Sequence, residues 1–179
     1  MSFSTDCAVL PDHVANACSK YAKGGFPSVA VVDKDHSITD WSNATQWNAN
    51  INSGKIKIIE RVKASAMDPS PVMIDNPVAC SSQQVLDAFD FKIDWTDANR
   101  SEFNDEFYKK LNNKSAFVVL WNKDESKVIV FDRDCTFVAA ANFPDSNRAF
   151  QYYKCEAHVS APKDWFPTTI TAPTGIFQF

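Results

Sequence analysis

The chain has 179 residues, of which 45% are hydrophobic and 22% charged, and its formal net charge is −4. This length predicts a single domain whose core needs neither disulfides nor a metal to hold it. Only 4 glycines are present, against roughly 12 expected from an average usage of about 7%. The shortage excludes the glycine-rich dinucleotide fingerprint. It also excludes a phosphate-binding P-loop, because Ala49 stands where the first glycine before Gly54-Lys55 is required.

Aromatic residues make up 13% of the chain, which predicts a well-packed core or a large contact surface. No basic stripe typical of a duplex-binding protein is visible. The five cysteines are scattered without any Cys-x-x-Cys pair, so we expect reduced thiols and no zinc ribbon. The first ten residues contain no signal-peptide pattern, and the longest apolar run covers only 116–121. We therefore expect a soluble protein without a membrane partner.

The N-terminal part of the chain predicts a short helix followed by a strand. Apolar residues spaced by three or four positions mark one helical stripe, and Gly24-Gly25 is suited to end it. The stripe consists of Leu10, Val14, Cys18 and Tyr21. The valine-rich segment 26–33 then predicts a strand.

A second helix is predicted over residues 41–52, with Asp40 as its N-cap and Gly54 as its stop. Its apolar face would carry Trp41, Ala44, Trp47 and Ile51. Residues 55–63 alternate between apolar and charged side chains, which indicates a strand.

Residues 64–84 contain three prolines and several serines and show neither helical nor strand periodicity. Structureless segments of about 20 residues are uncommon inside compact domains. Several apolar side chains argue against simple disorder here, namely Met67, Val72, Met73, Ile74 and Val78. We therefore predict an extended, apolar loop or arm.

The clearest strand signal covers 85–95, where packed and solvated positions alternate. A helix follows over about 99–111, capped by Asp97 or Asn99. Phe103, Phe107 and Leu111 repeat every four residues, so this helix is expected to pack its phenylalanine stripe on the sheet.

The C-terminal third predicts a hairpin of 116–121 with 127–132, then strands over 135–141 and 150–160. Residues 160–179 combine three prolines with many apolar side chains and indicate a second, C-terminal arm. The predicted fold is a single α+β domain over 1–179. It is a mainly antiparallel β-sandwich with one packed helix, a short N-terminal helical region and extended arms.

Candidate chemical sites are weak. Cys155 and His158 are residue types that commonly bind metals, but they would point to opposite faces of a strand. Asp33 and Asp35 lack the glycine and glutamate of a calcium loop, and a solvated turn is the better interpretation.

The carboxylates of Asp90 and Asp94 lie on a predicted solvent face without a pocket. Asp132 and Asp134 beside Cys135 would need a histidine to activate the thiol, and only three histidines are available. We therefore predict no catalytic, cofactor-binding or metal-binding residues, no cofactor and no enzymatic activity.

The two arms are the most informative features, because monomers rarely leave large apolar surfaces unburied. Each arm is expected to pack either on its own domain or on a neighbouring subunit. The predicted assembly contacts are Met67, Val72, Met73, Ile74, Trp165, Phe166, Ile176 and Phe177.

A succession of local cues runs along nearly the whole chain. They are Gly24-Gly25 before 29–33, Asp40-Trp41 with Trp47, 54–58, 69–71, 76–80, the strand and helix of 91–111, 118–121 and 173–177. In this order the chain resembles virion structural proteins of tailed phages that infect Bacteroidetes, crAss-like phages included.

The resemblance implies a tail or tail-ring subunit with a tail-tube-like sandwich, in which 64–84 would be the long loop that reaches the next subunit. The implied partners are further copies of the chain, other virion proteins, and genomic DNA that passes a lumen without specific binding. The implied location is the virion. Two other hypotheses stay open: a monomeric, carbohydrate-directed binding module that uses exposed Trp41, Trp47 or Trp165, and a carboxylate-dependent hydrolase.

Overall fold

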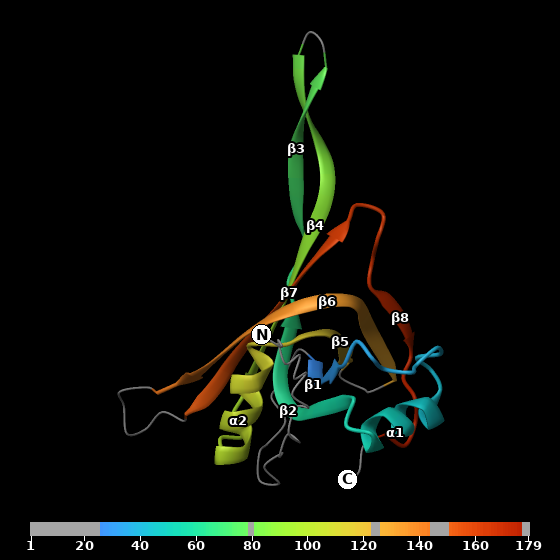
Figure 1. Ribbon diagram of the computed structural model, residues 1–179, viewed down its shortest axis with the longest axis vertical. Helices are drawn as coiled ribbons and strands as arrows, with labels where there is room; N and C mark the ends of the chain where they lie inside the picture. Colours follow the sequence, from blue (N-terminus) through green and yellow to red (C-terminus); the bar gives the residue numbers. More distant parts are fainter. Residues whose placement is uncertain (1–25, 79–80, 123–125, 144–150, 177–179) are drawn as a thin grey trace, which may run out of the picture.

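The computed structural model describes residues 26–78, 81–122, 126–143 and 151–176. It contains one antiparallel eight-stranded sheet and two helices, which confirms a mainly-β α+β fold (Figure 1). The elements in chain order are β1 (Phe26–Val32), α1 (Ala44–Asn52), β2 (Ile56–Ala66), β3 (Ser70–Val78), β4 (Ser81–Asp97), α2 (Glu102–Leu111), β5 (Ser115–Trp121), β6 (Lys127–Asn142), β7 (Tyr152–Pro162) and β8 (Thr168–Thr171). The predicted N-terminal helix lies outside the described residues.

The sheet closes on itself into a barrel. Its strand order is β2-β1-β5-β6-β7-β4-β3, and β2 also pairs with β4 through Lys63↔Thr96 to Ala66↔Ile93. The strands therefore form one closed layer rather than the two separate sheets of the expected sandwich. Strand β3 lies outside the closed ring and pairs only with β4 among the described strands.

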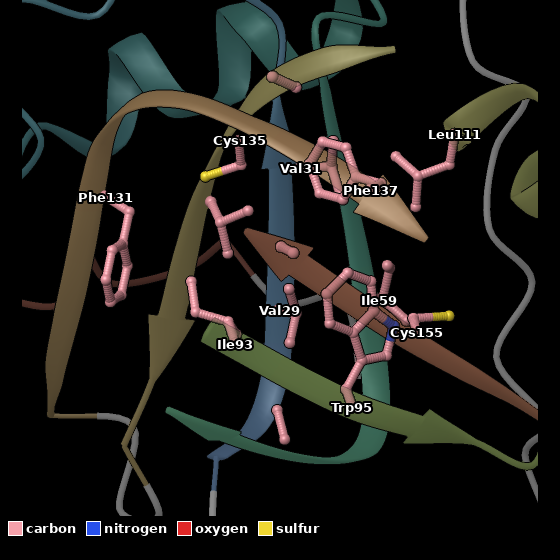
Figure 2. Packing of buried hydrophobic residues seen from close by; sticks show 14 of the residues in the cluster. Val29, Val31, Ile59, Ile93, Trp95, Leu111, Phe131, Cys135, Phe137 and Cys155 are labelled. Carbon is pink, nitrogen blue, oxygen red and sulfur yellow. The ribbon is translucent and has the colours of Figure 1, made fainter. Parts of the chain in front are cut away.

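Every second side chain along the strands points inward, and these apolar side chains fill the barrel interior. Val29 and Val31 of β1 point inward, as do Ile59 of β2, Ile93 and Trp95 of β4 and Cys155 of β7 (Figure 2). Helix α2 lies at one end of the barrel and adds Phe107, Tyr108 and Leu111 to this cluster. Burial of these large apolar side chains is the dominant stabilising term for the fold.

A second core covers the outer face of β1, β5 and the first half of β6. Ala30, Val32 and Val119 point outward there and are buried beneath α1 and the C-terminal segment. Trp47 of α1 is completely buried and packs edge-to-face on Trp121, with ring centroids 5.2 Å apart.

Both helices have N-cap residues that differ from the predicted ones. The side chain of Asn43 accepts hydrogen bonds from the backbone N–H groups of Thr45 and Gln46, whereas Asp40 instead holds Ser42 in the preceding turn. Gly54, with φ of 77°, follows α1 as predicted, because a positive φ is needed where the chain leaves the helix. Ser101 caps α2 by accepting from Asn104 N.

The buried face of α2 differs from the expected phenylalanine stripe. Phe107 and Leu111 are buried as predicted, but Phe103 is 68% exposed, and Asn104 and Tyr108 are buried in its place. The exchange has a physical reason, since the carboxylate of Asp97 lies inside this end of the barrel and needs polar partners. Tyr108 donates to Asp97 Oδ2 at 2.7 Å, and the backbone N–H of Asn99 donates to Oδ1 at 2.8 Å.

The segment predicted as an extended arm over 64–84 is a strand hairpin. Residues 64–66 finish β2, and β3 pairs with β4 from Ser70↔Asp90 to Val78↔Ser81. Prolines 69, 71 and 77 hide the strand pattern in the sequence, although an edge strand tolerates proline because its outer N–H groups have no partner in the sheet. The hairpin extends away from the barrel (Figure 1).

The predicted C-terminal arm packs on its own domain. Strand β8 pairs with β6 from Lys127↔Thr171 to Val130↔Thr168, and Ala172 and Ile176 join the second core. Strand β6 itself is continuous where two strands were expected, because a register shift opposite residues 116–118 lets it bend without ending.

The barrel closure depends on a bend in β2 at Arg61, which has a positive φ of 59° next to the register shift between Phe26 and Ser28. A left-handed conformation costs a β-branched residue more than asparagine. We expect Arg61→Val to be less stable than Arg61→Asn by about 1 kcal/mol. Urea unfolding of both variants measures the difference. Equal stabilities would contradict a backbone role for this position.

Candidate assembly surface

The hairpin of β3 and β4, here called the hairpin, carries apolar side chains on both of its faces. Met73 pairs with Leu86 and Ile74 pairs with Val85. Paired residues share a face and successive residues point to opposite faces, so one pair lies on each side of the two-stranded ribbon. Antiparallel strands commonly pack one face and leave the other in water, so apolar side chains on both faces of a solvated hairpin are unusual.

These side chains remain exposed in the single chain. Met67 is 54% exposed, Met73 46% and Ile74 48%, while Val72 is half-buried. An isolated two-stranded hairpin is marginally stable in water unless another surface covers it. Three of the four predicted contacts in this segment, Val72, Met73 and Ile74, therefore lie on β3, and Met67 lies just before it, where its N–H donates to Lys92 O.

The hairpin region is also acidic. Residues 64–91 contain four aspartates and no lysine, arginine or histidine. The described aspartates are all exposed, and they are Asp68, Asp75, Asp87 and Asp90. The basic side chains of the described residues therefore all lie outside residues 64–91.

The base of the hairpin is held firmly on the barrel. The turn after β7 donates a backbone hydrogen bond from Lys163 N to Asp87 O at 3.3 Å. Phe166 lies over Phe89, with ring centroids 6.2 Å apart. These two contacts fix the base of the hairpin on the barrel and so set the direction in which it projects.

The four predicted C-terminal contacts differ in their outcome. Ile176 is buried in the second core, so the prediction that it contacts a neighbour is wrong. Trp165 is half-buried against Phe91, and its indole N–H donates to Asp132 Oδ1 at 3.1 Å. Phe166 is 62% exposed beside the hairpin base, and Phe177 lies outside the described residues.

Sequence reasoning missed three further exposed apolar side chains, on α2, on β6 and directly after β6. They are Phe103 on α2, Val138 on β6 and Phe143 just after β6. Phe143 lies under the guanidinium of Arg100, 4.1 Å from its ring centroid. The helical spacing of Phe103 predicted that it would be buried. The apolar character of the three side chains was therefore the only sequence feature that could have indicated a contact surface.

Of the weak chemical candidates, Asp90, Asp134 and His158 line one open groove, whereas the two described cysteines are buried. Cys155 points into the barrel, whereas the exposed His158 lies 3.4 Å from a Glu156 carboxylate oxygen on the outer face. Among the described residues, no three histidine, cysteine or acidic side chains come together as ligands for a metal ion. Asp90 lines an open groove of about 610 Å³ on the outer sheet, and Asp94 accepts a hydrogen bond from Ser65 Oγ. Neither carboxyl is enclosed.

Burial raises the pKa of the Cys135 thiol to about 12 and that of Cys155 well above its ordinary value. A thiol of this kind stays neutral at pH 8 and is a poor nucleophile. We expect both cysteines to resist iodoacetamide at pH 8 in the native protein and to react after unfolding in urea. Peptide mapping by mass spectrometry checks this, and rapid native labelling of Cys135 would contradict it.

Of the tryptophans expected as a carbohydrate-stacking surface, Trp47 is part of the core, and Trp41 and Trp165 are partly buried against it. Trp47 is fully buried, and Trp41 packs on it with ring centroids 5.8 Å apart. Trp165 presents its ring to Phe91 and Arg133. The prediction of exposed stacking platforms is wrong for Trp47, and the other two rings are engaged by their own domain.

The sequence matches no protein-family model and no curated protein. Neither helix of the described chain is long and apolar enough to cross a membrane. The most distinctive feature of the described chain is a projecting, acidic hairpin with apolar side chains on both faces.

Proposed function

We propose that the protein is a non-enzymatic structural subunit that assembles with further copies of itself through its hairpin. The observation that carries this proposal is the exposure of Met73 and Ile74 on opposite faces of one projecting ribbon. An element that is apolar on both sides and anchored at its base is suited to insertion between neighbouring surfaces.

The proposed assembly is a ring, tube or connector of a phage virion, of the tail or tail-ring type. Support comes from the resemblance of the local sequence cues and from the projecting hairpin, whose strand β3 falls within 64–84, the segment expected to be a subunit-bridging loop. A net charge of −4 suits a channel that DNA traverses without binding, because like charges repel.

Light scattering of the purified chain over a range of concentrations, followed by negative-stain imaging, tests this function. We expect masses that are multiples of 20.0 kDa and rings or tubes in the images. A chain that stays monomeric at millimolar concentration would contradict self-assembly. Binding to glycans without any assembly would favour the binding-module hypothesis instead.

A further inference from the structure

The two edges of the hairpin differ in their capacity to accept a further strand. Strand β3 forms one edge, and Pro71 and Pro77 lie within it. Proline has no N–H, so inside a strand it is tolerated only where its nitrogen faces away from the paired strand. The outer edge of β3 therefore lacks donors at two positions where an added strand would need them, and it is poorly suited to extension of the sheet.

Residues 81–86 of β4 form the other edge. They pair with β3 alone among the described strands, because the pairing of β4 with β7 begins only at Ala88↔Pro162. At the end of this edge, Asp87 O already accepts from Lys163 N. Figure 1 shows the outer part of the hairpin standing clear of the barrel. The segment contains no proline, so each of its outward residues keeps an N–H donor for strand addition.

The register identifies the outward backbone groups of this edge. In an antiparallel pair, opposed residues alternate between pairs that exchange hydrogen bonds and pairs that do not. The pair Pro77↔Ser82 is of the second kind, because Pro77 has no N–H to exchange. The same alternation applies to Gln84 and Leu86, which lie two and four positions further along β4. The N–H and C=O groups of Ser82, Gln84 and Leu86 therefore point to the free edge.

This edge is also uncharged. Residues 76–86 contain no acidic or basic side chain, although residues 64–91 as a whole contain four aspartates. The nearest of these across the ribbon is Asp75 of β3, which lies opposite Gln84. When two β4 edges pair, their Asp75 residues are three strand spacings apart, about 14 Å, which exceeds the screening length of about 8 Å at physiological ionic strength. Two copies of this edge can therefore meet without strong repulsion between like charges.

We propose that the β4 edges of two copies pair antiparallel about Gln84, which joins the two hairpins into one four-stranded sheet. The pairing is two-fold symmetric, since Gln84 lies opposite Gln84 of the second copy and Ser82 lies opposite its Leu86. All three outward residues of each copy then exchange backbone hydrogen bonds. The two hairpins point in opposite directions, so the two barrels lie at opposite ends of the new sheet and do not collide. This inference rests on the proposed function and adds the edge that joins two copies.

The pairing also strengthens the hairpin itself. A lone two-stranded hairpin is marginally stable in water, whereas sheets of three or more strands with an apolar face are stable. Because opposed residues share a face, one face of the four-stranded sheet carries Met73 of both copies and the other carries Ile74 of both. These wider apolar faces stay available for the further contacts of a larger assembly.

Two proline variants at one cross-strand position test this pairing. Gln84→Pro removes the central outward N–H of β4, and Asp75→Pro removes the outward N–H of the opposite residue on β3. Neither N–H takes part in the pairing of β3 with β4, so both variants are expected to fold, which circular dichroism verifies. Asp75→Asn is the control for the charge that Asp75→Pro removes.

Light scattering over a concentration series should find that Gln84→Pro associates at least about tenfold more weakly than the wild type, because both copies lose their central donor. Asp75→Pro should associate like Asp75→Asn. Wild-type association of Gln84→Pro would overturn this inference and leave the proposed function standing, and equal weakening by Asp75→Pro would contradict the choice of edge.

Amide hydrogen exchange resolved to single residues gives a second readout on the wild-type chain. On assembly, the N–H groups of Ser82, Gln84 and Leu86 should become protected, while that of Asp75 stays fast because it remains unbonded on the outer edge of β3. An assembled chain in which Gln84 N–H exchanges as fast as in the monomer would overturn the inference. A wild-type chain that never assembles would overturn both this inference and the proposed function.

Discussion

Met73→Asp together with Ile74→Asp is expected to leave a folded monomer of 20.0 kDa under conditions in which the wild-type chain assembles. Both side chains are about half exposed in the single chain and contribute little to its own core. Since each is already about half buried, covering the rest of it in an assembly would stabilise by about half of the 1.5–3 kcal/mol of a fully exposed side chain. Losing two such contacts weakens association by at least about tenfold.

The introduced carboxylates strengthen this effect, because an interface that covers them would desolvate a charge without a partner. The melting temperature should change by only a few degrees, since exposed substitutions usually alter stability by less than about 0.5 kcal/mol. Sedimentation velocity measures the loss of assembly, with Thr169→Asp/Thr171→Asp as the control of equal added charge. Assembly by the hairpin variant at wild-type concentrations would contradict a role for the hairpin.

The second large effect is on stability. Trp47→Ala should lower the free energy of unfolding by about 3–5 kcal/mol, the usual range for a large aromatic ring removed from a core. Trp47 is completely buried, packs edge-to-face on Trp121 and donates from its indole N–H to Trp41 O at 2.8 Å. Its removal opens a cavity between α1 and the sheet.

Urea unfolding followed by fluorescence measures this loss. Trp47→Phe is the matched variant, and it should cost less because it keeps most of the ring volume and loses only the hydrogen bond and part of the contact area. A Trp47→Ala protein as stable as the wild type would show that α1 does not pack on the barrel as described.

Periodicity predicted the regular elements well because burial on one side imposes it. The alternation in 85–95 and the valine run in 26–33 correspond to β4 and β1, whose inward residues include Ile93 and Val29. Barrel closure was not predictable in this way, since it depends on a positive φ at Arg61 and on pairing between β2 and β4, which no local pattern records.

The candidate surface was predicted in part. Met67, Val72, Met73 and Ile74 were selected as contacts because they are apolar in a segment without period, and the structure places the last three on β3 and Met67 just before it. The strand conformation of β3 was missed because a ribbon that is apolar on both faces shows no alternation. Ile176 failed as a contact because the same apolar character that suits an interface also suits a core.

Phe103 shows the reverse error. Helical spacing predicted that Phe103 is buried together with Phe107. The buried Asp97 instead accepts a hydrogen bond from Tyr108, so the face of α2 that carries Tyr108 is buried and Phe103 is exposed. Sequence spacing identifies the possible apolar stripes of a helix. It does not tell which of two adjacent stripes faces the interior when a buried carboxylate there needs a polar partner.

Hydrogen–deuterium exchange on the wild-type chain, compared between dilute monomers and the concentrated assembly, tests the central claim most directly. The hairpin extends from the barrel, so its amides should exchange rapidly in the monomer. We expect peptides that cover 67–90 to become protected on assembly, while those from α1 and β5, already in the core, stay unchanged. Assembly without any change in exchange over 67–90 would contradict the conclusion that the hairpin joins the subunits.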